Sequence, residues 1–335
     1  MKTVPNNFCP FPSSNLGMQS WKLRLPVLSR GDRSVAPTGA CKAKVPKQEL
    51  GNQCKPIQLI VNADDYGYYP CVSRGILKAV AAGTVTATGI LANGPQLESQ
   101  ISWLSGYENL DLGIHLNLTS RNPLTSVMAG KLGRWDGKFP GVFAMTGEIL
   151  SGRIGLECVQ FEWRAQIETV LRCGINPVFL NSHEHIHMLP KLFKLARQLA
   201  EEYHIPHLRL TRAEWMPPLG FSSGLRNALL QAMESVNALR SGESVPLFIG
   251  LSRSGKLDFA YLKNRLARLK PGKVYELMCH PGHFDPAEIA DSRLLSYHAW
   301  EDELNLLTST GIKALFGEFN IRLINYREYT ASQIT

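Results

Sequence analysis

From Ile57 to about residue 325, short apolar runs alternate with segments of helical periodicity. Parallel strands need a long crossover, usually a helix, so this alternation predicts a parallel sheet covered by helices. Seven or eight such units favour a barrel over an open sheet. We therefore predict an α/β fold, a (β/α) barrel that is distorted or has seven strands, over residues 56–330. The predicted strands cover residues 57–64, 84–93, 110–119, 177–183, 207–213, 247–252, 273–280 and 312–319.

Helical segments lie between these strands. The segment 189–204 has Pro190 in its first turn, and its apolar residues recur at positions 192, 193, 195, 196 and 199. A stretch with Gly, Trp and Phe residues, 120–155, interrupts the alternation and predicts a long loop near the functional site. The other predicted helices cover residues 72–83, 156–174, 222–240, 257–269 and 292–310.

The first 50 residues hold eight of the 36 Lys and Arg residues but only two of the 28 acidic residues. This segment therefore carries most of the net charge of +8, and a nucleic-acid-binding surface on the rest of the chain is not supported. Residues 1–55 contain Pro, Ser, Gly and Asn clusters without sustained periodicity, which predicts a disordered basic extension. An organelle transit sequence is the alternative, although Pro26 interrupts its apolar and basic patch.

The composition bears on the remaining classes of protein. No run of about 18 apolar residues occurs, so no membrane-spanning helix is expected. The seven cysteines are dispersed without a CxxC pair, and no cleavable apolar segment opens the chain. This usage favours reduced thiols and an intracellular, cytoplasmic location. With 335 residues, 44% of them hydrophobic, the chain can bury a core of barrel size.

Polar and ionisable residues gather where the predicted strands end. Active sites of such barrels lie at the carboxyl ends of the strands, so we expect these side chains to meet. They are Asp64 and Asp65 after the first strand, His115 late in the third, Asn181, His183, His185 and His187 after the fourth, and His280 and His283 after the seventh.

Each of these residues has a simpler explanation when it is taken alone. A single His on a strand is more often a hydrogen-bonded core or surface group than a ligand, and an Asp before a turn is usually a cap. Histidines at alternate positions can form one polar face of a strand. Together, however, carboxylate and imidazole groups on one rim are the donors that a divalent cation requires. His280 is preferred to its neighbour Cys279 because adjacent strand residues point in opposite directions.

The segments that hold these residues resemble the hallmarks of the YdjC-like carbohydrate deacetylases. They read NADDYG at 62–67, GIHLNLT at 113–119, NSHEHIHM at 181–188 and HPGH at 280–283, and the resemblance covers about residues 57–325 in the family's order. One position departs from the family, because Asn181 stands where an Asp usually precedes Ser-His. An Asn side chain can still accept a hydrogen bond but adds no negative charge, so a lower metal affinity or rate is expected.

The resemblance implies a barrel-related fold and metal-dependent removal of acetyl groups from N-acetylated sugars such as chitooligosaccharides. It implies that Asp65, His115 and His183 are the metal ligands. Asp64 is then the catalytic base, which takes a proton from the water that attacks the acetyl carbonyl. Two adjacent carboxylates would thus serve two tasks, holding the cation and moving a proton.

The remaining histidines receive supporting roles. His280 is the expected general acid or oxyanion partner, and Asn181, His185 and His187 are expected to orient the ligands or to contact the substrate. Oxygen and nitrogen ligands together suit Mg, Zn, Mn or Co, and the resemblance favours Mg.

The expected partner is an acetylated oligosaccharide, and binding to a nucleic acid or a membrane is not expected. Assembly into a homo-oligomer is an open alternative. Two alternatives to the carbohydrate deacetylase remain. One is a metal hydrolase that acts on another acyl amide or ester, because a fold does not determine a substrate. The other is a catalytically impaired sugar-binding protein, in which Asn181 marks the loss of turnover.

Overall fold

The computed structural model of the chain describes residues 55–215, 221–241, 245–291 and 293–334. The extension predicted for residues 1–55 therefore lies, up to residue 54, outside the described residues. The helices are α1 (Pro70–Ala81), α2 (Leu97–Ser102), α3 (Ser126–Lys131), α4 (Val142–Leu150), α5 (Leu156–Arg172), α6 (Pro190–Glu202), α7 (Phe221–Ser241), α8 (Phe259–Leu266), α9 (Leu294–Tyr297), α10 (Trp300–Thr308), α11 (Thr310–Glu318) and α12 (Tyr326–Ile334). Three short 3₁₀ segments are η1 (Gly133–Trp135), η2 (His183–Met188) and η3 (Leu251–Arg253).

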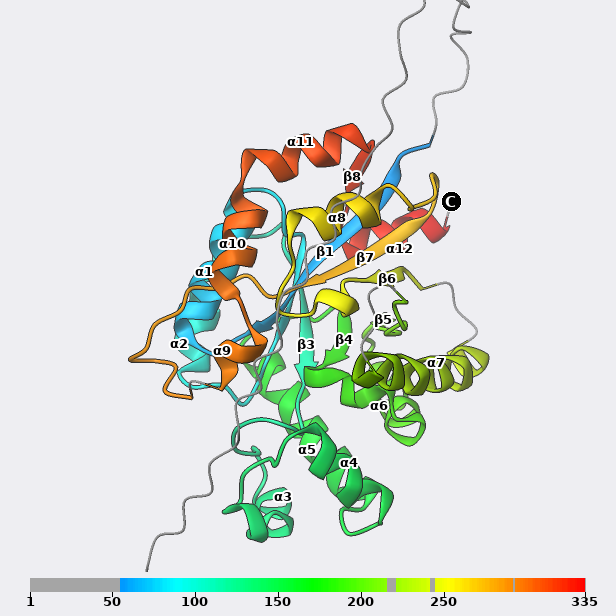
Figure 1. The fold of residues 1–335 in the computed structure, drawn as a ribbon. Coiled ribbons are helices and arrows are strands. Elements are labelled where there is room, and N and C mark those ends of the chain that lie inside the picture. The colour runs from blue at the N-terminus through cyan, green and yellow to red at the C-terminus, as the bar shows by residue number, and fades with distance from the viewer. Residues whose placement is uncertain (1–54, 216–220, 242–244, 292, 335) are drawn as a thin grey trace, which may run out of the picture. The chain divides into compact units, whose positions relative to one another are not determined.

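One parallel sheet runs through the described part of the chain, with helices around it (Figure 1). Seven strands follow the order β5-β4-β3-β2-β1-β7-β6, and an eighth, β8, pairs with the first residues of β1. The prediction of an α/β barrel that is distorted or seven-stranded is confirmed, because the seven strands of this order form a curled, incomplete barrel. The strands are β1 (Ile57–Tyr66), β2 (Ala87–Ile90), β3 (Asp111–Leu116), β4 (Phe179–Ser182), β5 (His207–Leu208), β6 (Leu247–Ile249), β7 (Val274–Cys279) and β8 (Ile321–Leu323).

The central strand β1 shows why the sequence forms this sheet. Leu59, Ile60 and Val61 are all fully buried, so both faces of the strand are covered and its apolar residues do not alternate with polar ones. β1 pairs with β2 and β7, and the pairing places Ala63 beside Cys279, near the carboxyl ends of both strands. The residues that follow these strands therefore emerge at one rim.

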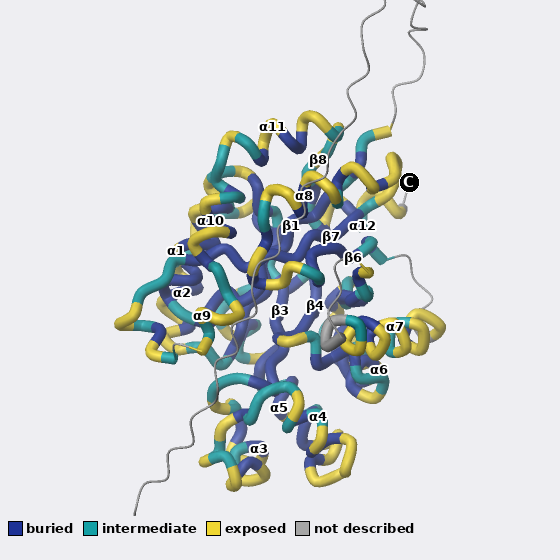
Figure 2. The backbone as a smooth tube through the Cα atoms, viewed as in Figure 1, coloured by how far each residue is buried: buried dark blue, intermediate teal, exposed yellow. Residues whose placement is uncertain are grey.

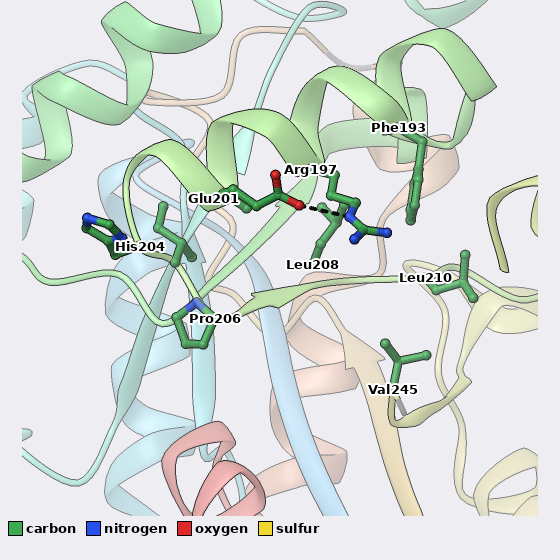
Figure 3. A pocket seen from close by; sticks show the side chains of 10 residues that line it. Phe193, Arg197, Glu201, His204, Pro206, Leu208, Leu210 and Val245 are labelled. Atoms are coloured by element: carbon green, nitrogen blue, oxygen red, sulfur yellow. Dashed lines mark hydrogen bonds and ion pairs between the residues drawn. The ribbon is translucent and has the colours of Figure 1, made fainter. Parts of the chain in front are cut away.

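The barrel is not closed between its two end strands. β5 and β6 lie at opposite ends of the strand order, and within the described residues no pairing joins them. Beside β5, a cavity of about 370 Å³ lies against α6 and is lined mostly by apolar side chains such as Phe193, Leu208 and Val245 (Figure 3). Arg197 and Glu201 form an ion pair of 3.1 Å on its wall. None of the residues predicted for the site lines this cavity.

The strand predicted at 312–319 is wrong. These residues belong to helix α11, whose first turn is capped by the Ser309 hydroxyl, which accepts the Ile312 N–H at 3.2 Å. Its buried residues Ile312, Leu315 and Phe316 are spaced three and four apart, which is the helical period rather than the strand period. A short apolar run fits both patterns, and here β8 follows the helix instead.

The segment 120–155 is only partly the long loop that was predicted. It contains α3, η1 and α4. The Thr125 hydroxyl caps α3 by accepting the Met128 N–H, and the buried carboxylate of Glu162 on α5 accepts the N–H groups of Leu124 and Thr125, both at 2.9 Å. The insertion is thus tied to the helix that follows it.

Buried residues fill the sheet and the inner faces of the helices that cover it (Figure 2). The four cysteines among the described residues are all free thiols. No helix in the described ranges is both long and apolar enough to span a membrane.

Candidate metal centre and catalytic site

The two carboxylates at the end of β1 reach the same site because the strand changes its conformation there. In a regular strand, Asp64 and Asp65 would point to opposite faces of the sheet. Asp65 has φ = 73°, in the left-handed region, and the pairing of β1 with β2 is irregular between Ala63 and Tyr66. Aspartate adopts this region more readily than most residues. The irregularity lets both side chains serve one centre.

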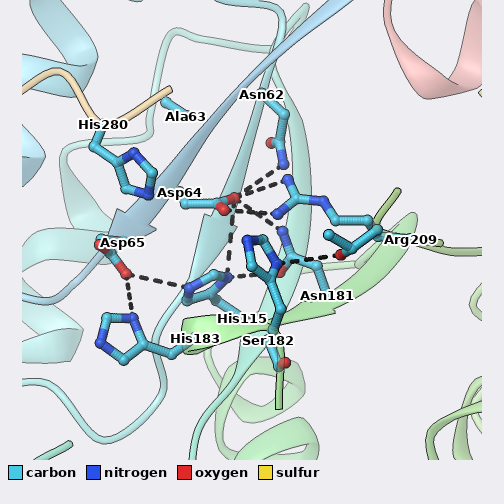
Figure 4. Close-up of polar contacts among 12 residues, drawn as sticks. Asn62, Ala63, Asp64, Asp65, His115, Asn181, Ser182, His183, Arg209 and His280 are labelled. Carbon is cyan, nitrogen blue, oxygen red and sulfur yellow. Dashed lines mark hydrogen bonds and ion pairs between the residues drawn. The ribbon is translucent and has the colours of Figure 1, made fainter. Parts of the chain in front are cut away.

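Asp65, His115 and His183 form a compact, buried cluster. One Asp65 carboxylate oxygen, Oδ1, lies 2.8 Å from His183 Nδ1 and 3.2 Å from His115 Nε2. Dashed lines mark both contacts in Figure 4. One ligand atom from each residue lies within 4.8 Å of the others. The second Asp65 oxygen, Oδ2, is buried without a hydrogen-bond partner. A buried acceptor of this kind is costly unless another group binds it, so the cluster fits a cation with oxygen and nitrogen ligands.

The charges in this cluster depend on one another. Burial opposes ionisation of Asp65, but His183 and His115 outweigh it and hold the pKa of the carboxyl well below its usual range. Burial likewise disfavours the charged form of His183, yet the Asp65 carboxylate raises the pKa of this imidazole to about 9. Without a cation, a proton on His183 therefore neutralises Asp65.

Asn181 joins this cluster to Asp64. Its Oδ1 accepts a hydrogen bond from His115 Nδ1 at 2.7 Å, which leaves His115 Nε2 free to face Asp65. Its Nδ2 donates to Asp64 Oδ1 at 2.9 Å. An ionised aspartate in this position could make the first contact but not the second. The loss of negative charge that the sequence indicated is thus accompanied by a hydrogen bond to the neighbouring carboxylate.

Asp64 itself is held by an arginine that the sequence analysis missed. Arg209, directly after β5, donates to Asp64 Oδ2 at 2.6 Å and to Oδ1 at 2.9 Å, and its Nε donates to Glu276 on β7 at 2.6 Å. Burial opposes ionisation of Asp64, but Arg209, with smaller contributions from His115 and His280, lowers its pKa to about 2. Arg209 lies between two leucines inside the strand predicted at 207–213, and a charged residue between apolar ones was the signal that the sequence offered.

The three histidines after β4 separate in space. They do not continue the strand, because β4 ends at Ser182, and residues 184 and 185 are left-handed with φ of 51° and 55°. Only His183 joins the cluster. His185 lies near Thr211 and Phe248, and His187 accepts the Ser182 hydroxyl and donates to the Arg209 carbonyl at 3.0 Å. Through the second of these hydrogen bonds, His187 contacts Arg209, the residue that binds Asp64.

His280 approaches Asp64 from another strand end (Figure 4). Its Nδ1 accepts the N–H of Gly255 at 3.2 Å, which leaves the proton of the neutral imidazole on Nε2. His298, which the sequence analysis did not select, packs its ring 5.3 Å from that of His280. His283 lies apart from the cluster and pairs with Glu301 at 3.2 Å on a partly exposed surface.

The fold and this cluster define a class: parallel α/β barrel-type proteins with a candidate divalent-metal site at the carboxyl ends of the strands. The chain belongs to the YdjC-like protein family, whose sequence profile matches residues 58–318.

Relatives in this family carry deacetylase names. A carbohydrate deacetylase from Geobacillus stearothermophilus is 30% identical over 82% of this chain and 98% of its own length. A chitooligosaccharide deacetylase from Escherichia fergusonii is 30% identical over 80% of this chain and 97% of its own length. A solved structure from Enterococcus faecalis V583, provisionally named a cellobiose-phosphate cleavage protein, is similar with a TM-score of 0.63 and 26% identity, covering 82% of this chain and 99% of that one.

Proposed function

We propose that this protein is a metal-dependent hydrolase that removes acetyl groups from N-acetylated carbohydrates of the chitooligosaccharide type. The observation that carries the proposal is the buried cluster of Asp65, His115 and His183 beside a second carboxylate, Asp64, that is anchored separately. The names of the relatives support the substrate class.

Asp65, His115 and His183 would hold the cation, and the unpartnered Asp65 Oδ2 is the acceptor that such an ion would satisfy. A bound divalent cation supplies Lewis acidity, which polarises the acetyl carbonyl and makes a nearby water more acidic. We propose Mg, with Zn, Mn and Co as the alternatives that the same donors accept.

Asp64 has the position and the charge of a base that is not a ligand. Its low pKa keeps it ionised at neutral pH, so it is ready to accept a proton from the attacking water. Arg209 fixes the direction of the carboxylate through two hydrogen bonds, while Asn181 adds a third contact from the side of His115. The same contacts make Asp64 a weak base, so the proton that it accepts is released readily.

His280 is the proposed oxyanion partner, which donates a hydrogen bond to the acetyl oxygen as negative charge develops on it. Hydrolysis breaks the C–N bond of the acetamide, the carbonyl carbon gains the water oxygen, and the nitrogen needs one proton to leave as an amine. With Nδ1 occupied by the Gly255 N–H, the neutral imidazole can donate a hydrogen bond from Nε2 but cannot give up that proton without becoming an imidazolate. We therefore propose that Asp64 passes to the nitrogen the proton that it takes from the water. His185 and His187 stay proposed as orienting or substrate-contacting groups.

The first experiment is acetate release from N,N′-diacetylchitobiose by metal-stripped protein to which Mg, Zn, Mn or Co is added back. We expect release that one of these metals restores. In parallel, a panel of acetylated amino acids and acyl esters tests the alternative substrates. No release from the sugar with any bound metal, together with turnover of another acyl compound, would reject the carbohydrate assignment.

A further inference from the structure

Glu303 on α10 is a fully buried carboxylate that the proposed reaction does not use. Its two oxygens hold two backbone groups from different segments. Oε2 accepts the N–H of His280 at 2.6 Å, and Oε1 accepts the N–H of Leu257 at 3.0 Å. One segment follows β7, and the other is the loop after η3. Glu303 therefore connects the end of β7, where His280 lies, to a loop about 25 residues away in sequence.

That loop also contains Gly255, the donor to His280 Nδ1. Gly255 has φ = 72°, and a Cβ atom there would lie 2.5 Å from the Tyr297 carbonyl oxygen. Its own carbonyl accepts the Ala299 N–H at 2.7 Å. Only glycine adopts this conformation in this space without strain, so the loop passes His280 with its N–H aimed at the ring.

The Glu303 carboxylate holds both segments in this arrangement by accepting one N–H group from each. Burial raises the pKa of Glu303, while His280 and the two N–H donors act in the opposite direction. A carboxylate can accept both N–H groups at once, whereas an amide has only one oxygen and would turn its NH₂ group toward one of the two donors. The contact therefore depends on a carboxylate and not only on a side chain of this shape.

We propose that Glu303 is a positioning residue for His280: by holding the strand end and the Gly255 loop together, it keeps the imidazole proton on Nε2, where it can donate a hydrogen bond to the acetyl oxygen of the substrate. The kinetic part of this inference rests on the proposed function, but the tautomer of His280 does not. A purely structural role for Glu303 would stabilise the fold without determining which ring nitrogen carries the proton.

The test compares the full-length, metal-loaded wild-type protein with Glu303→Gln. We expect kcat to fall about 10- to 100-fold, the usual range when a group that orients an active-site residue is changed, with KM and bound metal unchanged. The second measurement is the ¹⁵N NMR spectrum of histidine-labelled protein, in which His280→Gln identifies the His280 signals. In the wild type, Nε2 should carry the proton, and in Glu303→Gln the Nδ1 tautomer should become populated.

Glu162 provides a matched control. It is equally buried and also accepts two backbone N–H groups of a loop, those of Leu124 and Thr125, but none from a segment that contacts His280. Glu162→Gln should lower the free energy of unfolding in a comparable way while leaving kcat and the His280 spectrum as they are in the wild type.

Four outcomes test the two proposals. A wild-type His280 with its proton on Nδ1 would overturn the positioning role, even if Glu303→Gln does not fold. Unchanged kcat in a folded Glu303→Gln, or an equal loss of kcat in Glu162→Gln, would also overturn it. A wild type that releases no acetate but shows the expected tautomer and its change in Glu303→Gln would reject the proposed function and leave the positioning of His280 standing.

Discussion

Removing the Arg209 guanidinium should destabilise the protein strongly, because two buried carboxylates depend on it. The Arg209 side chain has no exposed surface, and the side chains of Asp64 and Glu276 are 2% and 3% exposed. Arg209→Met keeps a similar volume but leaves both carboxylates without their cation. Such a change in a buried ion pair costs about 3–5 kcal/mol of the free energy of unfolding, out of a typical total of about 5–15 kcal/mol.

The pH dependence of this loss follows from the Asp64 pKa. In the wild type, the pKa falls from 3.8 to about 2, which corresponds to a stabilisation of about 2–3 kcal/mol. This contribution is present above pH 3.8 and is lost as the pH falls toward 2. In Arg209→Met, burial without the guanidinium raises the Asp64 pKa instead. Protonation of Asp64 in acid therefore removes the cost of a buried, unpaired charge in the variant. The difference in unfolding free energy should therefore shrink as the pH falls from 7 to 3.

Urea unfolding of the metal-free proteins at several pH values measures this difference. Arg164→Met is the control, since Arg164 pairs with Glu202 on the surface with both side chains about 40% exposed, and such pairs contribute about 0–1 kcal/mol. A loss below about 1 kcal/mol for Arg209→Met at pH 7 would refute the reasoning, because it would place the variant within the range of a surface pair. A loss that does not change between pH 7 and 3 would refute the assigned role of Asp64.

Three other changes test the centre. Asp64→Asn should keep the bound metal but abolish turnover, whereas His115→Ala should lose the metal; near-normal activity of Asp64→Asn would reject it as the base. Metal binding at pH 7 should release about one proton, because the cation displaces the proton that Asp65 holds on His183. For the same reason, the affinity for the metal should rise with pH up to about 9. Calorimetry in buffers of different ionisation enthalpy measures the proton release, and its absence would contradict the prediction. Asn181→Ala should lower the affinity for the metal about 10- to 100-fold, because His115 Nδ1 loses its acceptor. Competition with a chelator measures this affinity, and an unchanged value would show that Asn181 does not orient His115.

The sequence predicted the sheet and the rim because both depend on local patterns. Fully apolar strands followed by helices require parallel pairing, and parallel pairing brings the carboxyl ends together. Asp64, Asp65, His115 and His183 could thus be gathered without coordinates. The strand predicted at 312–319 failed at the point where a short apolar run fits either period and only its packing decides.

The local backbone at the centre could not be predicted from the same patterns. The left-handed conformation of Asp65 makes two adjacent carboxylates face one site, and left-handed residues 184 and 185 send three alternating histidines in three directions. Strand periodicity would have predicted the opposite result in both cases. Both conformations require that the surrounding contacts outweigh the intrinsic preference of the chain.

The contacts that tune the site are beyond sequence patterns for a different reason: they join residues far apart in the chain. Arg209 meets Asp64 across 145 positions, and Asn181 meets it across 117. Asn181 shows how a contact between distant residues changes the interpretation of a single position. Judged from the sequence alone, Asn181 replaces the family's aspartate and lacks its negative charge. In the fold, it adds a donor to a carboxylate that already has a bidentate arginine, in a place where a further ionised carboxylate would lie 2.9 Å from Asp64 and repel it. The replacement therefore does not by itself indicate lost activity, because it preserves the orientation of His115 and the ionised state of Asp64.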